Sequence, residues 1–208
     1  MGVELIDKYF TLTSLQHERF VALEALYTSW NEKINVISRK DITNLYEHHI
    51  LHSLAIAKAL HFKEGTTIVD VGSGGGFPGI PLAILFPQVK FHLVDSIGKK
   101  MHVAEEVIKS IGLDNCTTQH IRMEEVKASF DFVVSRAAMP MPDLVKLVRK
   151  NIAKTSHNAL PNGILTLKGG DLTAELQPFR RDAVVYDISH WFAEPFFETK
   201  QLVYLPIM

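Results

Sequence analysis

The sequence is poor in cysteine, in long apolar runs and in excess charge of either sign. Cys116 is the single cysteine of the 208 residues, which excludes an internal disulfide and a cysteine-rich zinc site. No apolar run approaches the roughly 20 residues that span a bilayer, and the N-terminal MGVELIDKYF has early acidic residues in place of the apolar core of a secretory signal. The formal net charge is −1, so nucleic acid binding requires a local basic patch. We therefore predict a cytoplasmic protein that does not enter a membrane.

The first 60 residues have the periodicity of helices. Apolar residues recur at steps of three and four between Thr13 and Lys33, and Thr13 followed by Gln16 is the sequence pattern of a capping box. A second helix is expected from Ile42 to Leu60, after the polar connection INVISRKD. We expect residues 1–60 to form a helical segment packed on one side of the core.

From Gly65 onward, short apolar runs alternate with helical segments. The elements expected in order are strands at 66–72, 89–95, 116–122, 130–138 and 163–170, and helices beginning near Pro78 or Pro81 and covering 97–112 and 143–154. Two successive strands, 183–191 and 200–207, are expected to pair with each other. This order predicts an α/β, Rossmann-like, doubly wound sheet of seven strands in residues 61–208, mostly parallel, with an antiparallel strand near one edge.

A glycine-rich turn, GSGGGFPGIP, follows the first predicted strand directly. Glycines allow positive φ angles and let a ligand approach the backbone, and this position is where doubly wound folds bind nucleotides. A plain strand-to-helix turn is the alternative. Asp95 ends the second strand about twenty residues on, where a carboxylate accepts hydrogen bonds from ribose hydroxyls, unless it is a simple turn acid. Asp70, just before the turn, would repel a pyrophosphate and favours the cationic S-adenosylmethionine over NAD; alternatively, it binds N–H groups of the turn.

These motifs together resemble the glucose-inhibited-division B family. The segments that carry the resemblance span residues 27–170 and are WNEKINVIS, EHHILHSL, VDVGSGGGFPGIPLAI, LVDSIGKK, RMEE, VSRA and LKG. The resemblance implies a class I methyltransferase that moves a methyl group from S-adenosylmethionine to N7 of a guanine in small-subunit ribosomal RNA, with S-adenosylhomocysteine as product. It also implies the residues that bind the methyl donor, namely Asp70, Gly72, Gly74, Phe77, Asp95, Ser96, Met123, Glu124 and Arg136. The alternatives are that Arg136 only pairs with a nearby acid and that Glu124 only begins a helix.

The chemistry of this reaction needs few catalytic groups. Guanine N7 has a lone pair and no proton, so its methylation needs no general base, and catalysis rests on holding the reactants in line. We therefore expect no metal and no catalytic triad, and instead the positioning residues Asn35, Arg136, Lys168, His49 and Arg122. Lys168 is either a phosphate ligand or a surface lysine. The basic residues expected to contact RNA are Lys33, Arg39, Lys40, Lys99, Lys100, Arg122, Arg136, Lys168, Arg180 and Arg181.

The histidine-rich stretch EHHILHS departs from the family pattern RHILDSL at two positions. His48 stands in place of arginine and His52 in place of aspartate, while His49 is retained. A helical zinc pair has a carboxylate between its histidines, which is missing here, so metal binding is disfavoured. Other functions left open are methylation of another RNA or of a small molecule, nucleotide-dependent oxidation, and ligand binding without catalysis. A monomer bound to ribosomal RNA or to the small subunit is the simplest expectation.

Overall fold

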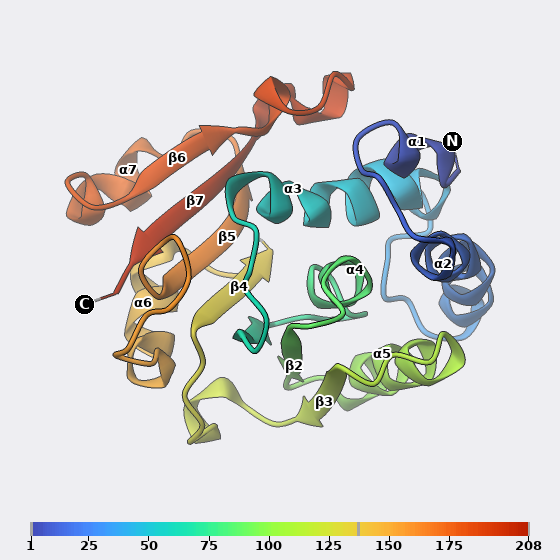
Figure 1. Ribbon diagram of the computed structural model, residues 1–208, viewed down its shortest axis with the longest axis horizontal. Coiled ribbons are helices and arrows are strands. Elements are labelled where there is room, and N and C mark those ends of the chain that lie inside the picture. The colour runs from blue at the N-terminus through green and yellow to red at the C-terminus, as the bar shows by residue number, and fades with distance from the viewer. Residues whose placement is uncertain (1, 137, 208) are drawn as a thin grey trace.

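The computed structural model describes residues 2–136 and 138–207 and contains one seven-stranded sheet flanked by helices (Figure 1). The strands lie in the order β3-β2-β1-β4-β5-β7-β6. β1 to β5 are parallel, and β7 is antiparallel to both β5 and β6. The predicted sheet, with its antiparallel strand near one edge and its final strand pair, is confirmed. The strands are β1 (Thr67–Val71), β2 (Lys90–Asp95), β3 (Cys116–His120), β4 (Phe132–Arg136), β5 (Gly163–Gly169), β6 (Val184–Asp187) and β7 (Lys200–Pro206).

Successive residues of the strands face two separate cores, as the alternation of side chains in a strand requires. On β1, Ile68 packs into one core and Val69 and Val71 into the other. The first core lies under the helices α1 (Glu4–Asp7), α2 (Ser14–Lys33), α3 (His52–Ala59), α4 (Gly79–Leu85) and α5 (Gly98–Ser110). The second lies under α6 (Met141–Val148) and the short α7 (Thr173–Leu176). Because both faces are covered, the central strands are mostly apolar, and Asp70 of β1 is a buried exception.

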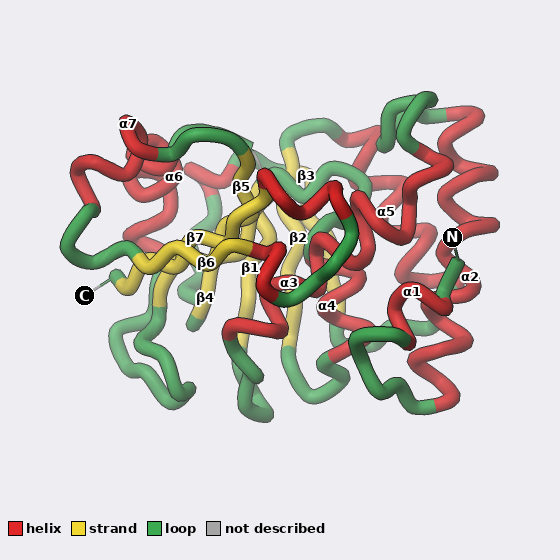
Figure 2. Tube along the Cα trace, turned by 90° about the horizontal axis from the view of Figure 1, so that it is seen from above, coloured by secondary structure: helices red, strands yellow, loops and turns green. Residues whose placement is uncertain are grey.

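The N-terminal helix α2 begins with the predicted capping box. The backbone N–H of Gln16 donates to the Thr13 hydroxyl over 3.3 Å, and the Thr13 N–H donates to the Gln16 side chain over 2.9 Å. Figures 1 and 2 both place α1 and α2 at one end of the molecule and the C-terminus at the other. None of the described helices is both long and apolar enough to cross a membrane.

The expected helix from Ile42 to Leu60 has a different form. It consists of a 3-10 turn at Ile42–Asn44, a π-helix at Leu45–Leu51 and the α-helix α3. Likewise, the expected helix 143–154 begins earlier, at Met141, and passes after Val148 into a 3-10 turn, Arg149–Asn151. Apolar spacing predicted that these segments are helical, but spacing alone does not separate i→i+4 from i→i+5 hydrogen bonding.

Candidate cofactor and active site

The glycine turn lies at the carboxyl end of β1, where the order of the strands reverses between β1 and β4. Gly72, Gly74 and Gly76 have φ angles of +70°, +55° and +103°, which side chains rarely adopt. The turn is anchored to the neighbouring strand, because the N–H of Gly72 donates to the carbonyl of Val94 over 2.9 Å. Such a switch point is the usual ligand site of an open α/β sheet.

Asp95 binds the turn from the end of β2. Its Oδ2 accepts from the N–H of Gly74 over 2.8 Å, and its Oδ1 accepts from the N–H of Ile97 over 2.8 Å. Each carboxylate oxygen has a second lone pair, so the group keeps acceptor capacity for a ligand. Because Asp95 is held on both sides, its carboxylate has a fixed direction beside the turn.

A cavity of about 200 Å³ opens next to Asp95. The predicted residues Gly72, Asp95 and Met123 line it, together with the predicted Ser96, Glu124 and Arg122. Its apolar walls come from Val71, Val94, Ile121, Met139 and Leu147. Apolar walls suit an adenine ring and a fixed carboxylate suits ribose hydroxyls, so the residues present fit the adenosine part of S-adenosylmethionine.

The N-terminal segment fixes the same turn from the other side. The fully buried Tyr27 of α2 donates its hydroxyl to the carbonyl of Gly75 over 2.6 Å. Val36, in the connection after α2, packs so closely on Gly75 that a Cβ there would lie 2.8 Å from the Val36 Cβ. Asn31 in turn accepts from the N–H groups of Val36 and Ile37, over 2.9 and 3.0 Å. The helical segment is thus part of the architecture of the turn.

Asp70 lies fully buried beneath the turn and does not line the cavity. Its Oδ2 accepts from the N–H of Gly79, at the start of α4, over 2.7 Å. This placement matches the alternative in which Asp70 holds the backbone of the turn, rather than the one in which it faces the ligand. Burial raises the pKa of its carboxyl to about 7, although the Gly79 N–H and Arg136 act in the opposite direction.

Phe77 and Arg136 form a second part of the site, outside the cavity. The Phe77 ring is 3% exposed and lies 4.8 Å from the Tyr27 ring and 5.4 Å from the His49 ring, measured between centroids. The guanidinium carbon of Arg136, at the end of β4, lies 5.2 Å from the Phe77 centroid. Its Nη1 donates to the carbonyl of His48 over 3.2 Å. Burial lowers the Arg136 pKa to about 10, so the guanidinium stays charged at neutral pH.

Residues 16–203 match the GidB family, described as rRNA small subunit methyltransferase G. The chain belongs to the GidB family. It is 61% identical to the ribosomal RNA small subunit methyltransferase G of Phocaeicola vulgatus, over 99% of each chain. It is 60% identical to that of Bacteroides thetaiotaomicron, over 99% of this chain and 100% of the relative. The predicted family, and with it the prediction of a methyltransferase, is confirmed.

Solved structures agree on the fold at low sequence identity. A SAM-dependent methyltransferase from Aquifex aeolicus matches with a TM-score of 0.56 and 19% identity, over 83% of this chain and 100% of that one. An rRNA methylase from Streptococcus thermophilus matches with a TM-score of 0.51 and 13% identity, over 76% and 95%. The class I methyltransferase fold predicted from the sequence is therefore confirmed.

The π-helix of this GidB-family chain directs its adjacent histidines to one acid. His48 Nδ1 lies 2.6 Å from Oδ1 of Asp41, and His49 Nε2 lies 2.6 Å from Oδ2. The His48 ring also stacks on Phe196, 3.8 Å away, near the C-terminus. Burial opposes ionisation of Asp41, but the hydrogen bonds from His49 and His48 outweigh it and lower the Asp41 pKa. The described residues contain no group of three or more potential ligands placed to hold a metal.

Two other predicted positioning residues lie away from the cavity. Lys168 is not on the surface, because it is 8% exposed and its ammonium donates to the carbonyl of Met139 over 2.6 Å and pairs with Glu175 at 3.0 Å. These contacts occupy the group that we expected to meet phosphate, and they hold the segment that carries Met139 of the cavity. Asn35 is exposed, next to the Val36 that covers Gly75.

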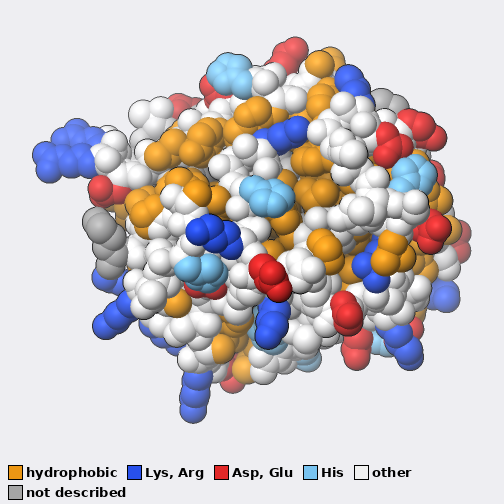
Figure 3. Space-filling model, viewed as in Figure 1, with side chains coloured by type: hydrophobic (Ala, Val, Ile, Leu, Met, Phe, Trp, Pro, Cys, Tyr) orange, Lys and Arg blue, Asp and Glu red, His pale blue; other side chains and the backbone are white. Residues whose placement is uncertain are grey.

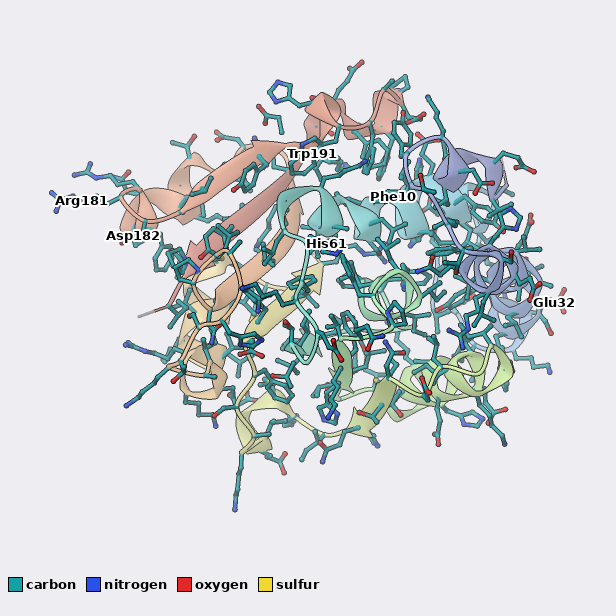
Figure 4. All side chains as sticks on the ribbon, in the orientation of Figure 1. Phe10, Glu32, His61, Arg181, Asp182 and Trp191 are labelled. Carbon is teal, nitrogen blue, oxygen red and sulfur yellow. The ribbon has the colours of Figure 1, made fainter. Side chains whose placement is uncertain are left out.

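On the face of the GidB-family chain that Figure 3 shows, the basic residues do not form one patch. On the face in Figure 3, Lys and Arg side chains are spread out and interspersed with acidic ones. Arg180 and Arg181 precede β6, which runs parallel to β5, so they lie toward the amino ends of the strands. Figure 4 shows Arg181 projecting outward at the edge of the molecule. Arg180 and Arg181 therefore lie away from the glycine turn, and Lys168, another of the residues expected to contact RNA, is buried.

Tyr27 and Asp41 are the contributions to the site that sequence reasoning missed. Tyr27 was expected only as a core residue, and its spacing gives no sign that its hydroxyl meets Gly75. Asp41 ends a polar connection and becomes part of the site only through the fold. A larger cavity, about 780 Å³, lies at the amino ends of β1 to β3 and includes Thr67, His92 and Phe130. It is far from the glycine turn in the fold, so it does not compete as the cofactor site.

Proposed function

We propose that the protein transfers a methyl group from S-adenosylmethionine to N7 of a guanine in small-subunit ribosomal RNA. One observation carries the proposal in a chain of this family. The cavity at the carboxyl edge of the sheet combines a glycine turn of positive φ, the fixed carboxylate of Asp95 and apolar walls around Met123. These are the features that an adenosine moiety without phosphates requires.

The residues of the chain divide the binding of the donor among them. Asp95 accepts from the ribose hydroxyls, while Met123 and Glu124 flank the adenine. Gly72 and Gly74 let the donor approach the backbone, with Ser96 at the rim. Phe77 lies outside the cavity and beside Arg136, which supports a contact between its ring and the methionine moiety. Asp70 supports this arrangement from below through Gly79.

The reacting base is positioned rather than activated. When bound, S-adenosylmethionine supplies a methyl group on a sulfonium, which is already a good leaving group. N7 carries no proton, so none of the side chains has to remove one, and the task of the protein is alignment and exclusion of water. Arg136 donates a hydrogen bond to the guanine, and His49 lies beside the guanine. Asn35, Arg122 and the exposed Arg39 and Lys40 meet the RNA backbone.

The remaining parts of the proposal concern organisation and setting. Residues 1–60 form a helical segment that covers the methyltransferase domain, residues 61–208, and belongs to its active site through Tyr27. The protein acts as a monomer in the cytoplasm on ribosomal RNA or on the small subunit.

Transfer of tritium from labelled S-adenosylmethionine to small subunits tests the proposal. Subunits from cells lacking the activity should accept label from the wild-type protein. Chemical cleavage of the RNA chain at 7-methylguanine should then locate the labelled nucleotide. Arg136→Ala should lose most of the transfer, because the charged donor beside Phe77 is removed. Raising the salt concentration should lower the rate steeply, since phosphate contacts release counterions. Absence of label in the RNA, with label in a small molecule instead, would overturn the assignment.

A further inference from the structure

The His49 side chain presents a hydrogen-bond acceptor that none of the described residues uses. Its Nε2 lies 2.6 Å from Asp41 Oδ2, and a carboxylate only accepts, so the ring proton resides on Nε2. Nδ1 is therefore left with a free lone pair. This atom is buried and has no hydrogen-bond partner among the described residues. An unsatisfied buried polar atom is costly, and such atoms are rare enough in native proteins to require an explanation.

The neutral state of the ring is built into the site. Burial and the charge of Arg136 together lower the pKa of His49 to about 4, because they outweigh the hydrogen bond to Asp41. At neutral pH His49 is therefore an imidazole that donates at Nε2 and accepts at Nδ1. A protonated histidine would donate at both nitrogens and would offer no acceptor.

A charged donor, Arg136, contacts the same aromatic ring as His49. The His49 ring and the Arg136 guanidinium both contact the Phe77 ring, at 5.4 and 5.2 Å from its centroid. Arg136 also donates to the carbonyl of His48, the residue before His49. Arg136 is the partly exposed member of the group, and His49 is 9% exposed. The end of β4 and the π-helix thus bring one donor and one acceptor to the Phe77 ring, and the donor is partly exposed.

We propose that His49 selects guanine as the methyl acceptor, with its Nδ1 accepting from the N1–H or N2–H₂ edge while Arg136 donates to O6. This inference rests on the proposed function. In guanine, O6 lies between N7 and N1–H, so a base whose N7 faces the methyl donor can present O6 and N1–H to the pair. Adenine presents the opposite pattern, an amino donor toward Arg136 and a bare N1 toward the His49 lone pair. The pair therefore accepts guanine and repels adenine.

Asp41 is the positioning residue for this contact. It fixes the tautomer of His49 through Oδ2 and binds His48 through Oδ1, at 2.6 Å each. The π-helical winding between Leu45 and Leu51 brings both adjacent histidines to the same carboxylate. The stacking of His48 on Phe196 holds this arrangement from the C-terminal side.

Three replacements of His49 distinguish a role of its Nδ1 as hydrogen-bond acceptor from a role of its ring in packing. His49→Asn keeps an acceptor oxygen near the position of Nδ1 and gives up the contact with Asp41. His49→Gln keeps a polar group near Nε2 and gives up the acceptor, and His49→Phe removes both. His52→Phe is the matched control, because His52 is a buried histidine of the same helical stretch that also has an unpartnered nitrogen but packs on Phe196 and Phe197.

Each variant is assayed for kcat and KM with small subunits from cells lacking the activity, for the dissociation constant of S-adenosylmethionine by calorimetry, and for thermal unfolding. We expect His49→Phe and His49→Gln to lose about tenfold in kcat/KM for the subunit, the order of one hydrogen bond at a reading site. His49→Asn and His52→Phe should stay within about threefold, and donor affinity should change less than about twofold throughout.

The inference is overturned if His49→Asn falls as far as His49→Gln, or if His49→Phe keeps wild-type kcat/KM. It is also overturned if the losses appear in donor affinity instead of subunit methylation. If His49→Phe unfolds at the assay temperature, the comparison of kcat/KM between His49→Asn and His49→Gln still tests the inference. Failure of the wild-type protein to methylate the subunits would refute the proposed function, which is a separate outcome.

Discussion

Replacing Tyr27 with Phe removes a single buried hydrogen bond that joins α2 to the glycine turn. The hydroxyl donates to the Gly75 carbonyl over 2.6 Å, and Tyr27 is 0% exposed, so no water can take its place. The ring contact with Phe77, 4.8 Å between centroids, is retained. Leaving a buried carbonyl unsatisfied costs about 1–3 kcal/mol, so we expect the free energy of unfolding to fall by about 2 kcal/mol.

The same change should weaken binding of the methyl donor. Gly75 follows Gly74, whose N–H holds Asp95, so a looser turn populates its binding geometry less. If about 1 kcal/mol of the loss falls on the turn, the dissociation constant of S-adenosylmethionine rises about fivefold. Urea denaturation measures the first quantity and isothermal titration calorimetry the second.

Tyr46→Phe provides the matched control. The Tyr46 hydroxyl donates to the Phe20 carbonyl over 3.1 Å, and the residue is 3% exposed, but this bond lies within the helical segment and does not reach the turn. We expect a comparable loss of stability with unchanged donor affinity. Equal effects of both variants on donor affinity would refute the argument, as would a stability change below about 0.5 kcal/mol for Tyr27→Phe.

Three further changes test other parts of the site. Asp95→Asn removes the charge and one acceptor oxygen, so calorimetry should find donor affinity lower by roughly tenfold or more. Asp70, whose pKa burial raises to about 7 from 3.8, binds its proton more tightly in the folded chain. The stability that this proton contributes is therefore lost as the pH rises from about 4 to 7. In Asp70→Asn, the free energy of unfolding from urea denaturation should depend less on pH over this range. Lys168→Met leaves Glu175 and the Met139 carbonyl without their partner, which should lower the free energy of unfolding by about 2 kcal/mol and weaken donor binding.

Each of these changes has an outcome that contradicts its reasoning. Donor affinity unchanged in Asp95→Asn would exclude the carboxylate from the ribose site. A stability profile of Asp70→Asn that parallels the wild type between pH 5 and 7 would show that another group carries the slope. Lys168→Met with wild-type stability would mean that its buried contacts contribute nothing net, and a large rise in the KM for the subunit alone would support the phosphate role.

The accuracy of the sequence-based predictions depends on the range of the interaction. The capping box of Thr13, the glycine turn and Asp95 rest on local rules of backbone geometry, and the structure places them as expected. The alternative that Lys168 is a surface lysine was wrong. Its partners, Met139 and Glu175, come from segments before and after β5 that only the fold brings to it. The π-helix Leu45–Leu51 was missed because the spacing of apolar residues does not distinguish i→i+5 from i→i+4 hydrogen bonding.

The amino-acid sequence was enough to predict the order of strands and helices, the class of fold and the edge of the sheet that holds the candidate cofactor site. These follow from the period of the apolar residues and from glycines that permit positive φ, both of which act over a few residues. Only the tertiary structure decided that Tyr27 holds the turn, that Lys168 is buried and that Asp41 fixes His49. Hydrogen bonds between segments far apart in the chain depend on distances of a few tenths of an ångström, which no local pattern records.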